Sequence, residues 1–410
     1  MMTLKKIDER TYEEFVSQSN QSSIYQSSEW KHLKELEGKK TELLGLFLDD
    51  KLVGVSLIVY SRVLKKYYFA YASRGFVYDY ADILGFKKAL IKYFKKKKVV
   101  FFRMDPAIVL AKYDKNMNKE DILASRQLIE SLKYYGFKHY GFNQGFETMQ
   151  FRFVHILDVV DNFELQKQTM SKSTRKNIDM ANFRGVKIKK GGIQDIPLAI
   201  SFFEMSGERK HFTGFDIKYY ERLYEAFKDN LTLYIAYIDK KVYVANLNNK
   251  LQDLKKELTD LKDKMQHDNV GKKLKHQEEL LKQSSEKYKE ELAEANKLAN
   301  ETSIAAMLSI RKYEEVVSYV SGMNNDYRKF NPKYAMYPAM IEDAIHEKLQ
   351  TVNFLGVKNI FDKNDSDYGM YDVKRGFGGH TIEYIGEFDL PIKKSLYMIY
   401  KLKTKLKGGK

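Results

Sequence analysis

Residues 247–265 read LNNKLQDLKKELTDLKDKM, and the way this stretch folds decides how the rest of the chain is divided. Its apolar residues alternate steps of four and three, at Leu247, Leu251, Leu254, Leu258, Leu261 and Met265. So narrow an apolar stripe is typical of a seam between two helices and too narrow for a helix in a globular core.

The heptad spacing stops and then resumes further along the chain. Residues 267–271 break it with Asn and Gly, which tolerate the backbone of a chain reversal. Steps of seven then follow at Leu274, Leu281, Tyr288 and Ala295. The sequence therefore predicts an antiparallel coiled-coil helical arm over residues 241–301.

The arm is neutral, whereas the whole chain carries a net charge of +16. Residues 246–301 contain 12 Lys and 12 Asp plus Glu, so the positive excess lies on the remaining body. A basic body favours polyanionic partners such as nucleic acid, an anionic membrane or a phosphorylated substrate. Neutrality favours a spacer or dimer surface over a tRNA-contacting arm, and both interpretations stay open.

Other features of composition limit the class of protein. The chain has no cysteine, which excludes disulfides and thiolate chemistry. No run of 18 apolar residues and no secretory signal is evident, so we expect a cytoplasmic protein. Residues 393–410 hold seven lysines and no acid. They either lie on an anionic membrane surface or pack on the body as an ordinary helix.

The body repeats one order of elements. Strands are expected at residues 43–48, 52–60 and 67–72, a helix at 83–97 and a strand at 99–104. The same order recurs as strands at 231–238, 304–311 and 315–321, a helix at 337–349 and a strand at 351–355. The arm then occupies a hairpin turn, where insertions are tolerated. Two similar α/β units are predicted, with a binding site at their junction.

Standard phosphate-loop, dinucleotide and nucleophile-elbow signatures are absent, and the histidines have no metal-type spacing. Two segments at strand ends suit a site instead. Arg74 and Tyr78 flank a glycine and could hold an anionic, partly apolar ligand, or simply pack the strand end. Asp105 could accept a proton from an amine, or cap the turn before Pro106.

Two basic segments complete the candidates. Lys172, Arg175 and Lys176 share a face near an expected helix start, which suits phosphate binding or a solvated basic face. Lys374 and Arg375 lie among glycines and aromatic residues. A lysine there could stabilise an oxyanion or a phosphodiester, and a plain loop is the alternative.

Together these segments resemble the Fem family of bacterial cell-wall transferases. The shared pattern comprises residues 26–30, 73–80, 105–106, 207–209, 325–330, the Lys374 loop and 383–388, with the arm in the second half. Within the family the chain is most similar to the streptococcal members that add alanine or serine.

The resemblance implies an α/β (α+β) fold of two tandem acetyltransferase-like (GNAT) domains with the inserted coiled-coil arm. The first domain would span residues 1–153, with 387–410 packing back on it. The second would span 154–240 and 302–386, and the arm 241–301.

The resemblance also implies an activity. An aminoacyltransferase of this kind takes an amino acid from aminoacyl-tRNA and joins it to an amino group of the lipid-linked peptidoglycan precursor, on the stem or its first branch residue. L-alanine is the first expectation, with serine and glycine as alternatives. Aminoacyl-tRNA is the co-substrate, and neither a cofactor nor a metal is expected. We expect a monomer, peripheral at the inner face of the cell membrane.

Residue roles follow from the resemblance position by position. Lys374 and Asp105 match catalytic positions. The substrate-binding set is Lys34, Arg74, Tyr78, Tyr219 and Arg209. For tRNA binding, the charge of the body and not the resemblance favours the set Lys172, Arg175, Lys176 and Arg375. Phe215 departs from the family, whose members often have Arg there, so Lys218 or Arg222 would have to compensate.

Two other classes of function remain as alternatives. The first is a non-catalytic RNA-binding or membrane-associated scaffold on a Fem-like body. The second is a CoA-dependent N-acetyltransferase, which is disfavoured because the Arg/Gln-x-x-Gly-x-Gly/Ala pyrophosphate turn is missing.

Overall fold

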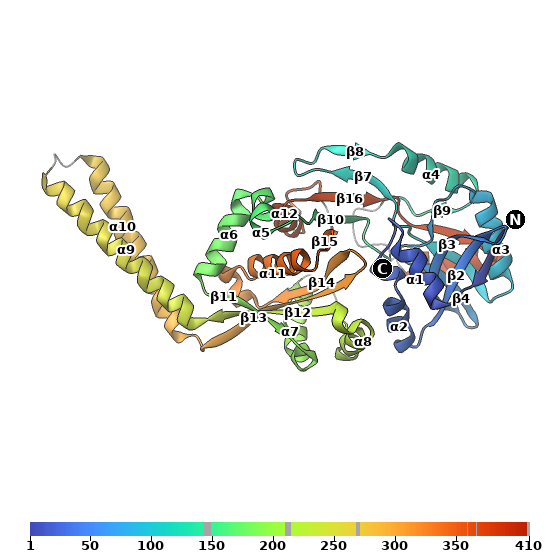
Figure 1. Cartoon of the computed structure of the whole chain (residues 1–410), viewed down its shortest axis with the longest axis horizontal. Coiled ribbons are helices and arrows are strands. Elements are labelled where there is room, and N and C mark those ends of the chain that lie inside the picture. Colours follow the sequence, from blue (N-terminus) through green and yellow to red (C-terminus); the bar gives the residue numbers. More distant parts are fainter. Residues whose placement is uncertain (143–148, 210–214, 268–270, 359, 366, 408–410) are drawn as a thin grey trace.

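The computed structural model shows an elongated body built on two β-sheets, with a long helical arm projecting from one end (Figure 1). The structure describes residues 1–142, 149–209, 215–267, 271–358, 360–365 and 367–407. The unit built on the first sheet and the unit built on the second lie side by side, and the arm extends from the second, away from the first (Figure 1).

The first sheet has the order β1-β2-β3-β4-β6-β17-β9, and the short β5 (Val77–Tyr78) pairs with β3. Its strands are β1 (Met2–Lys6), β2 (Lys40–Leu48), β3 (Lys51–Leu64), β4 (Tyr67–Ala72), β6 (Val99–Met104), β17 (Phe388–Pro391) and β9 (Lys138–His139). Helix α3 (Ile83–Lys95) covers one face, and α1 (Glu9–Ser17) and α2 (Ser28–Leu36) cover the other.

The second sheet has the order β11-β12-β13-β14-β15-β10-β16-β7-β8. Its strands are β11 (Val186–Gly191), β12 (Leu231–Asp239), β13 (Glu301–Lys312), β14 (Glu315–Met323), β15 (Thr351–Val357), β10 (Phe153–Asp158), β16 (His380–Tyr384), β7 (Val109–Tyr113) and β8 (Lys119–Asp121). Helix α11 (Lys333–His346) covers one face, and α7 (Ile196–Arg209) and α8 (Ile217–Phe227) cover the other.

The remaining helices are α4 (Leu123–Tyr134), α5 (Phe163–Thr169), α6 (Lys172–Phe183), α9 (Lys240–His267), α10 (Lys272–Lys297), α12 (Tyr368–Gly376) and α13 (Lys394–Lys407). Four short 3₁₀ turns are also described, at Ile24–Gln26, Ile193–Asp195, Lys228–Asn230 and Asn325–Phe330.

The predicted internal repeat is confirmed by strand pairing. In the first unit, β2, β3 and β4 are antiparallel neighbours, and after α3 the strand β6 pairs parallel to β4. In the second unit, β12, β13 and β14 are antiparallel neighbours, and after α11 the strand β15 pairs parallel to β14. The arm joins β12 to β13, where the first unit has only the Asp49-Asp50 turn. The mixed α/β fold of two tandem units is therefore the predicted one.

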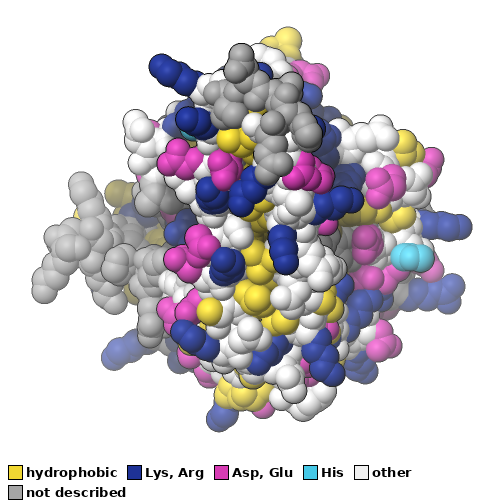
Figure 2. All heavy atoms as spheres, turned by 90° about the vertical axis from the view of Figure 1, so that its left-hand side faces the viewer, with side chains coloured by type: hydrophobic (Ala, Val, Ile, Leu, Met, Phe, Trp, Pro, Cys, Tyr) yellow, Lys and Arg dark blue, Asp and Glu magenta, His cyan; other side chains and the backbone are white. Residues whose placement is uncertain are grey.

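The arm consists of α9 and α10, which lie side by side and antiparallel (Figure 1). Leu247, Leu254 and Leu261 are buried, as is Ala295 on α10, so the heptad positions do form the seam. Most of the predicted break, residues 268–270, lies outside the described residues. Viewed from the arm side, Lys and Arg side chains are interspersed with Asp and Glu instead of forming one basic patch (Figure 2).

The two sheets exchange strands, and only one of the two exchanges differs from the predicted partition, in which residues 387–410 already pack back on the first domain. Strand β17, near the end of the chain, pairs with β6 of the first sheet. Conversely β7 and β8, which lie inside the range assigned to the first domain, extend the second sheet through pairing of β7 with β16. The prediction placed residues 109–121 in the first domain. It is wrong about their sheet, because both of their strands belong to the second sheet. A short strand's partner is fixed by tertiary packing, not by its own sequence pattern.

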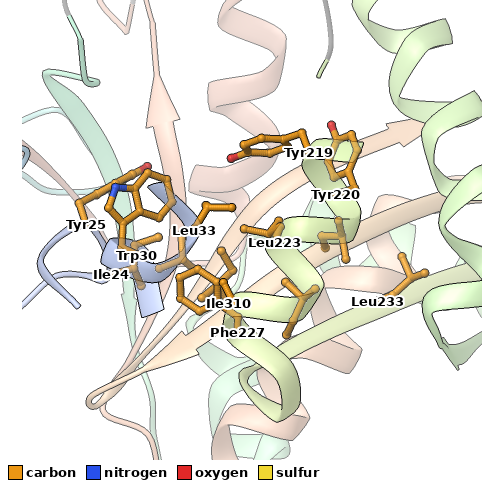
Figure 3. Packing of buried hydrophobic residues seen from close by; sticks show 14 of the residues in the cluster. Ile24, Tyr25, Trp30, Leu33, Tyr219, Tyr220, Leu223, Phe227, Leu233 and Ile310 are labelled. Carbon is orange, nitrogen blue, oxygen red and sulfur yellow. The ribbon is translucent and has the colours of Figure 1, made fainter. Parts of the chain in front are cut away.

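One hydrophobic core joins the two units (Figure 3). Trp30 and Leu33 of α2 pack with Leu223 and Phe227 of α8, and the Trp30 and Phe227 rings lie 6.4 Å apart. Because apolar burial is the main favourable term in packing, this shared core fixes the two units against each other. Side chains at the junction are thus held by both units.

Candidate active site

A buried polar group lies where the two units meet, and we term it the junction cluster. It consists of Tyr25, Tyr71, Arg74, Asp105, Glu315 and Tyr384. Asp105 follows β6 and Arg74 follows β4, so both lie at the carboxyl ends of the parallel strand pair. In open α/β sheets this edge is the usual place for ligands.

Asp105 is only 4% exposed and holds the cluster together. Its Oδ1 accepts a hydrogen bond from the Tyr71 hydroxyl (3.1 Å) and another from the Arg74 backbone N–H (2.8 Å). Its Oδ2 lies 3.9 Å from the Arg74 guanidinium and accepts no hydrogen bond within the described part of the chain. One carboxylate oxygen is thus available for a further donor.

Burial raises the pKa of Asp105 to about 7, because a charged carboxylate is poorly solvated there. The positive charge of Arg74 opposes this rise, and the negative charge of Glu387 adds to it. A carboxyl group that titrates near neutrality can both accept and release a proton at working pH. This suits the proton-accepting role predicted for Asp105.

Besides its ion pair with Asp105, Arg74 is held in place by two further contacts. Its guanidinium donates to the carbonyl of Phe151 (2.5 Å) and lies 4.0 Å above the ring of Tyr384. Its backbone has a φ of 52°, a conformation rare outside glycine. At Gly75, a Cβ would lie 2.6 Å from Ser56 Oγ and 2.9 Å from Gln26 Nε2, so a larger residue would displace these two buried side chains.

Glu315 contributes a second carboxyl group from the other unit, and it was not among the predicted residues. It starts β14 and accepts a hydrogen bond from Asn353 (2.9 Å). Burial raises its pKa to about 7, against the opposing effects of that hydrogen bond and of Arg74. A lone glutamate after a hairpin turn carries no local signal of a site, so only the contact between units reveals it.

A second group, the cation cluster, brings together the predicted residues Lys34 and Tyr219. The Lys34 ammonium lies 4.6 Å from the Trp30 ring and 5.9 Å from the Tyr219 ring, and it pairs with Glu37 at 3.0 Å. Burial lowers the pKa of Lys34, and the nearby charge of Arg222 is one of the smaller effects in the same direction.

Phe215, at the position where the family often has arginine, contacts a residue of the cation cluster. Phe215 stacks on Tyr219 with ring centroids 3.9 Å apart, so it supplies an aromatic face and no charge. Arg222, one of the two predicted replacements, acts electrostatically on Lys34, and its Nε has no hydrogen-bond partner among the described residues. Lys218 is exposed. Arg222 is therefore the better placed to compensate.

The two clusters are continuous through Tyr25. Its ring lies 4.7 Å from that of Trp30 in the cation cluster. The charges of Arg74 and Asp105 both act on its hydroxyl, whose pKa is raised mainly by burial. A path of cations, aromatic rings and carboxyls therefore runs along the junction of the two units.

Lys374 lies beside the junction cluster and is linked to it through two intervening residues, Gly356 and Phe151. Its side chain, 5% exposed, donates to the carbonyl of Gly356 (2.7 Å) near the end of β15. The ring of Phe151 occupies the space that a side chain at Gly356 would need, and the Phe151 carbonyl accepts from Arg74. Lys374 thus stands at the end of the parallel strand pair of the second unit, as Asp105 does in the first.

The predicted tRNA-binding residues gather in one region. Ser171 caps α6 and its backbone N–H donates to the carbonyl of Gly376, so the start of α6 packs against the end of α12. Lys172 and Lys176 are exposed there, while the Arg175 guanidinium lies 3.5 Å from two carbonyls of α5. On α12, Arg375 pairs with Asp372 at 2.6 Å.

Two predicted substrate-binding residues do not join either cluster. Tyr78 is buried in the core of the first unit, where its hydroxyl accepts the backbone N–H of Asp82 (3.0 Å) at the start of α3. Arg209 ends α7, and its side chain lies outside the described residues.

The raised pKa of Asp105 gives a prediction for stability. Since the pKa lies above its ordinary value of 3.8, the folded protein binds this proton more tightly than the unfolded chain. Asp105 therefore destabilises the fold increasingly as the pH rises from about 4 to about 7. Asp105→Asn cannot ionise and keeps an oxygen for Tyr71 and for the Arg74 N–H.

We expect the free energy of unfolding of Asp105→Asn, relative to the parent protein, to increase by about 2–4 kcal/mol between about pH 5 and about pH 8. Denaturant unfolding at the two pH values measures it. A difference between the two proteins that does not change with pH would contradict the raised pKa.

Comparison with known proteins shows the family of this chain. Residues 7–405 match the FemAB family. The aminoacyltransferase FemA of Staphylococcus epidermidis is 28% identical over 427 residues, covering 99% of this chain and 100% of that protein. FemA of Staphylococcus aureus is 28% identical over 392 residues, covering 92% of each. The crystal structure of FemX has the same fold, with a TM-score of 0.73 at 23% identity, over 97% of this chain and 99% of that one.

The match over nearly the whole length decides the class. The chain belongs to the FemAB family and is an aminoacyltransferase.

Proposed function

We propose that this enzyme transfers an amino acid from aminoacyl-tRNA to an amino group of the lipid-linked peptidoglycan precursor, on the peptide stem or on its first branch residue. L-alanine is the first candidate, with serine and glycine as alternatives. The observation that carries the proposal is the continuity of a cation cluster with buried carboxyls of raised pKa at the junction of the two units.

The reaction exchanges an ester for an amide. The acceptor amine attacks the ester carbonyl of the charged tRNA, a tetrahedral oxyanion forms, and the ribose hydroxyl leaves with a proton. Because the ester is already activated, the protein mainly positions the reactants and stabilises the developing charge. The attacking amine loses a proton during the reaction, and Asp105, with a pKa of about 7, is suited to accept it.

The two substrates have separate binding regions in this proposal. Lys34 and Arg222 hold the phosphates of the precursor, with Trp30 and Tyr219 packing beside them. The tRNA phosphates meet Lys172, Arg175, Lys176 and Arg375 at the α6 and α12 ends. Lys374, between this region and the junction cluster, stabilises the oxyanion.

The decisive test incubates the purified protein with lipid-linked precursor and tRNA charged with one radioactive amino acid at a time. Label is expected in the lipid product with alanyl-, seryl- or glycyl-tRNA. If no tRNA gives labelled product, while the protein still binds tRNA or vesicles, the scaffold alternative is favoured over the transferase. Acetyl-CoA serves as the control donor and is expected to give no product.

The neutral charge of the arm gives a prediction for tRNA binding. Replacing residues 246–300 with a short turn between β12 and β13 removes 12 lysines and 11 acidic residues, so the net charge hardly changes. Since phosphate binding depends on positive charge, we expect tRNA affinity to change less than about threefold. Filter binding measures it, and a loss of tenfold or more would assign the arm a direct contact with tRNA.

A further inference from the structure

Helix α13 is apolar on two opposite sides. Its inner side packs on the first sheet, where Tyr397 is buried and its ring lies 5.3 Å from that of Phe101. On the outer side, Met398, Ile399 and Leu402 are 56%, 44% and 60% exposed. At 3.6 residues per turn these three side chains form a stripe about 100° wide, opposite the buried face.

Lysines border this outer stripe on both edges. Lys394 and Lys401 lie along one edge and Lys403 along the other, by the same helical spacing. Residues 393–410 contain seven lysines and no acidic residue, so the partner of this face should be anionic as well as apolar. An anionic bilayer has both properties, since lysine stems can lie along the apolar boundary while the ammonium groups reach the headgroups.

A surface cavity opens beside the stripe. It is lined by Lys138, His139, Tyr140, Tyr397, Met398 and Lys401. The ammonium groups of the two lysines rest on aromatic rings, Lys401 at 4.3 Å from Tyr140 and Lys138 at 5.2 Å from Tyr397. This leaves both positive charges close to any anion that enters the cavity.

Two described carboxyl groups beneath the cavity, Asp389 and Glu387, share one arginine. Asp389 is fully buried and pairs with Arg103 at 2.8 Å, and it also accepts hydrogen bonds from the Tyr140 and Tyr397 hydroxyls. Arg103 also pairs with Glu387 at 3.0 Å. Three cations, Arg103, Lys138 and Lys401, thus lie beside these two carboxyl groups, which leaves a net positive charge for a phosphate group at the cavity.

A chain of aromatic contacts connects α13 to the junction cluster. The Tyr397 ring touches Phe101, the Phe101 ring stacks on Phe69 at 5.2 Å, and Phe69 lies 6.4 Å from Tyr71. The Tyr71 hydroxyl in turn donates to Asp105. The inner side of α13 is thus connected to the junction cluster through two intervening rings, those of Phe101 and Phe69.

We propose that α13 and the adjoining cavity form a docking surface for an anionic phospholipid bilayer. Met398, Ile399 and Leu402 enter the boundary between headgroups and acyl chains, while Lys138 and Lys401 hold a headgroup phosphate. This inference rests on the proposed function, which gives the enzyme a lipid-linked substrate. Binding to the bilayer itself does not require aminoacyl transfer. Within the described residues, no helix is both long and apolar enough to cross a membrane.

The test measures cosedimentation of the full chain with vesicles. We expect binding to vesicles of phosphatidylglycerol and phosphatidylcholine, and at least tenfold weaker binding to phosphatidylcholine alone. Met398→Gln combined with Leu402→Gln is expected to weaken binding about 10- to 100-fold, because two apolar side chains no longer enter the boundary. Lys138→Gln combined with Lys401→Gln should weaken only the binding that depends on the anionic lipid.

Leu123→Gln combined with Ile193→Gln is the matched control. Both residues are exposed, at 67% and 53%, and neither belongs to α13 or to the lining of the cavity. This variant should bind vesicles as the parent protein does, and all variants should keep the parent melting temperature because every substituted side chain is at the surface or at the cavity rim.

Three results would overturn the docking surface. These are absence of binding to anionic vesicles, unchanged binding by the Met398 and Leu402 variant, or a dimer seen by analytical ultracentrifugation that this variant dissociates. The last result would make α13 a self-association surface. Transfer to a water-soluble muropeptide, measured in parallel, separates the two proposals, because it requires the catalytic site and no membrane.

Discussion

Arg74→Met is expected to lower the free energy of unfolding by about 3 kcal/mol and the transfer rate by about 100-fold or more. The guanidinium balances Asp105, donates to the Phe151 carbonyl and lies on the Tyr384 ring. Removing it leaves a buried carboxyl without its counter-charge and an acceptor without its donor. The pKa of Asp105 should then rise above about 7, so the pH dependence of the rate should shift upward.

A double-mutant cycle separates the charge of Arg74 from its packing. Asp105→Asn removes the negative charge, so Arg74→Met should cost less in that background than in the parent protein. Denaturant unfolding of all four proteins at about pH 8 gives the coupling energy. If Arg74→Met costs the same in both backgrounds, the two side chains are not electrostatically coupled and the arrangement of the junction cluster is wrong.

Lys374→Met is expected to lower kcat by about 100- to 1,000-fold, the usual effect of removing a donor that stabilises an oxyanion. The methionine has a similar volume and keeps the apolar contacts of the buried lysine stem. The loss of the hydrogen bond to Gly356 should reduce the free energy of unfolding by about 1–3 kcal/mol. Single-turnover transfer from charged tRNA measures the chemical step.

The neighbouring Arg375→Gln is the matched comparison for Lys374. Arg375 faces solvent in part and pairs with Asp372, so its loss should raise KM for tRNA severalfold and leave kcat nearly unchanged. The opposite effects on kcat and KM distinguish stabilisation of the oxyanion from phosphate binding. A folded Lys374→Met protein with full kcat would exclude the role given to this lysine.

Local patterns in the sequence were enough to predict the repeated elements. The helix expected at residues 83–97 is α3 (Ile83–Lys95), and the strand expected at 99–104 is β6 (Val99–Met104). The heptads placed the arm, which begins with α9 at Lys240. These features depend on residues a few positions apart, so periodicity alone reveals them.

Features that depend on contact between the units were not predictable in the same way. Asp105 and Arg74 were found because they follow strand ends, where sites are common. Glu315 was missed because its position beside Arg74 results from the packing of one unit on the other. Tyr78 also lies near a strand end, but its side chain belongs to the hydrophobic core of the first unit. A strand-end position alone therefore does not identify a residue of the site.

The exchange of strands between the sheets has a consequence for the newly made protein on the ribosome. Strand β6 ends at Met104, but its neighbour β17 begins at Phe388, about 280 residues later. At about 5–20 residues per second, β6 waits roughly 15–60 seconds for this partner. During that interval its edge is open to pairing with other chains. Synthesis of this enzyme should therefore depend on chaperones until nearly the last residues emerge, and C-terminal truncations should aggregate instead of yielding a soluble first unit.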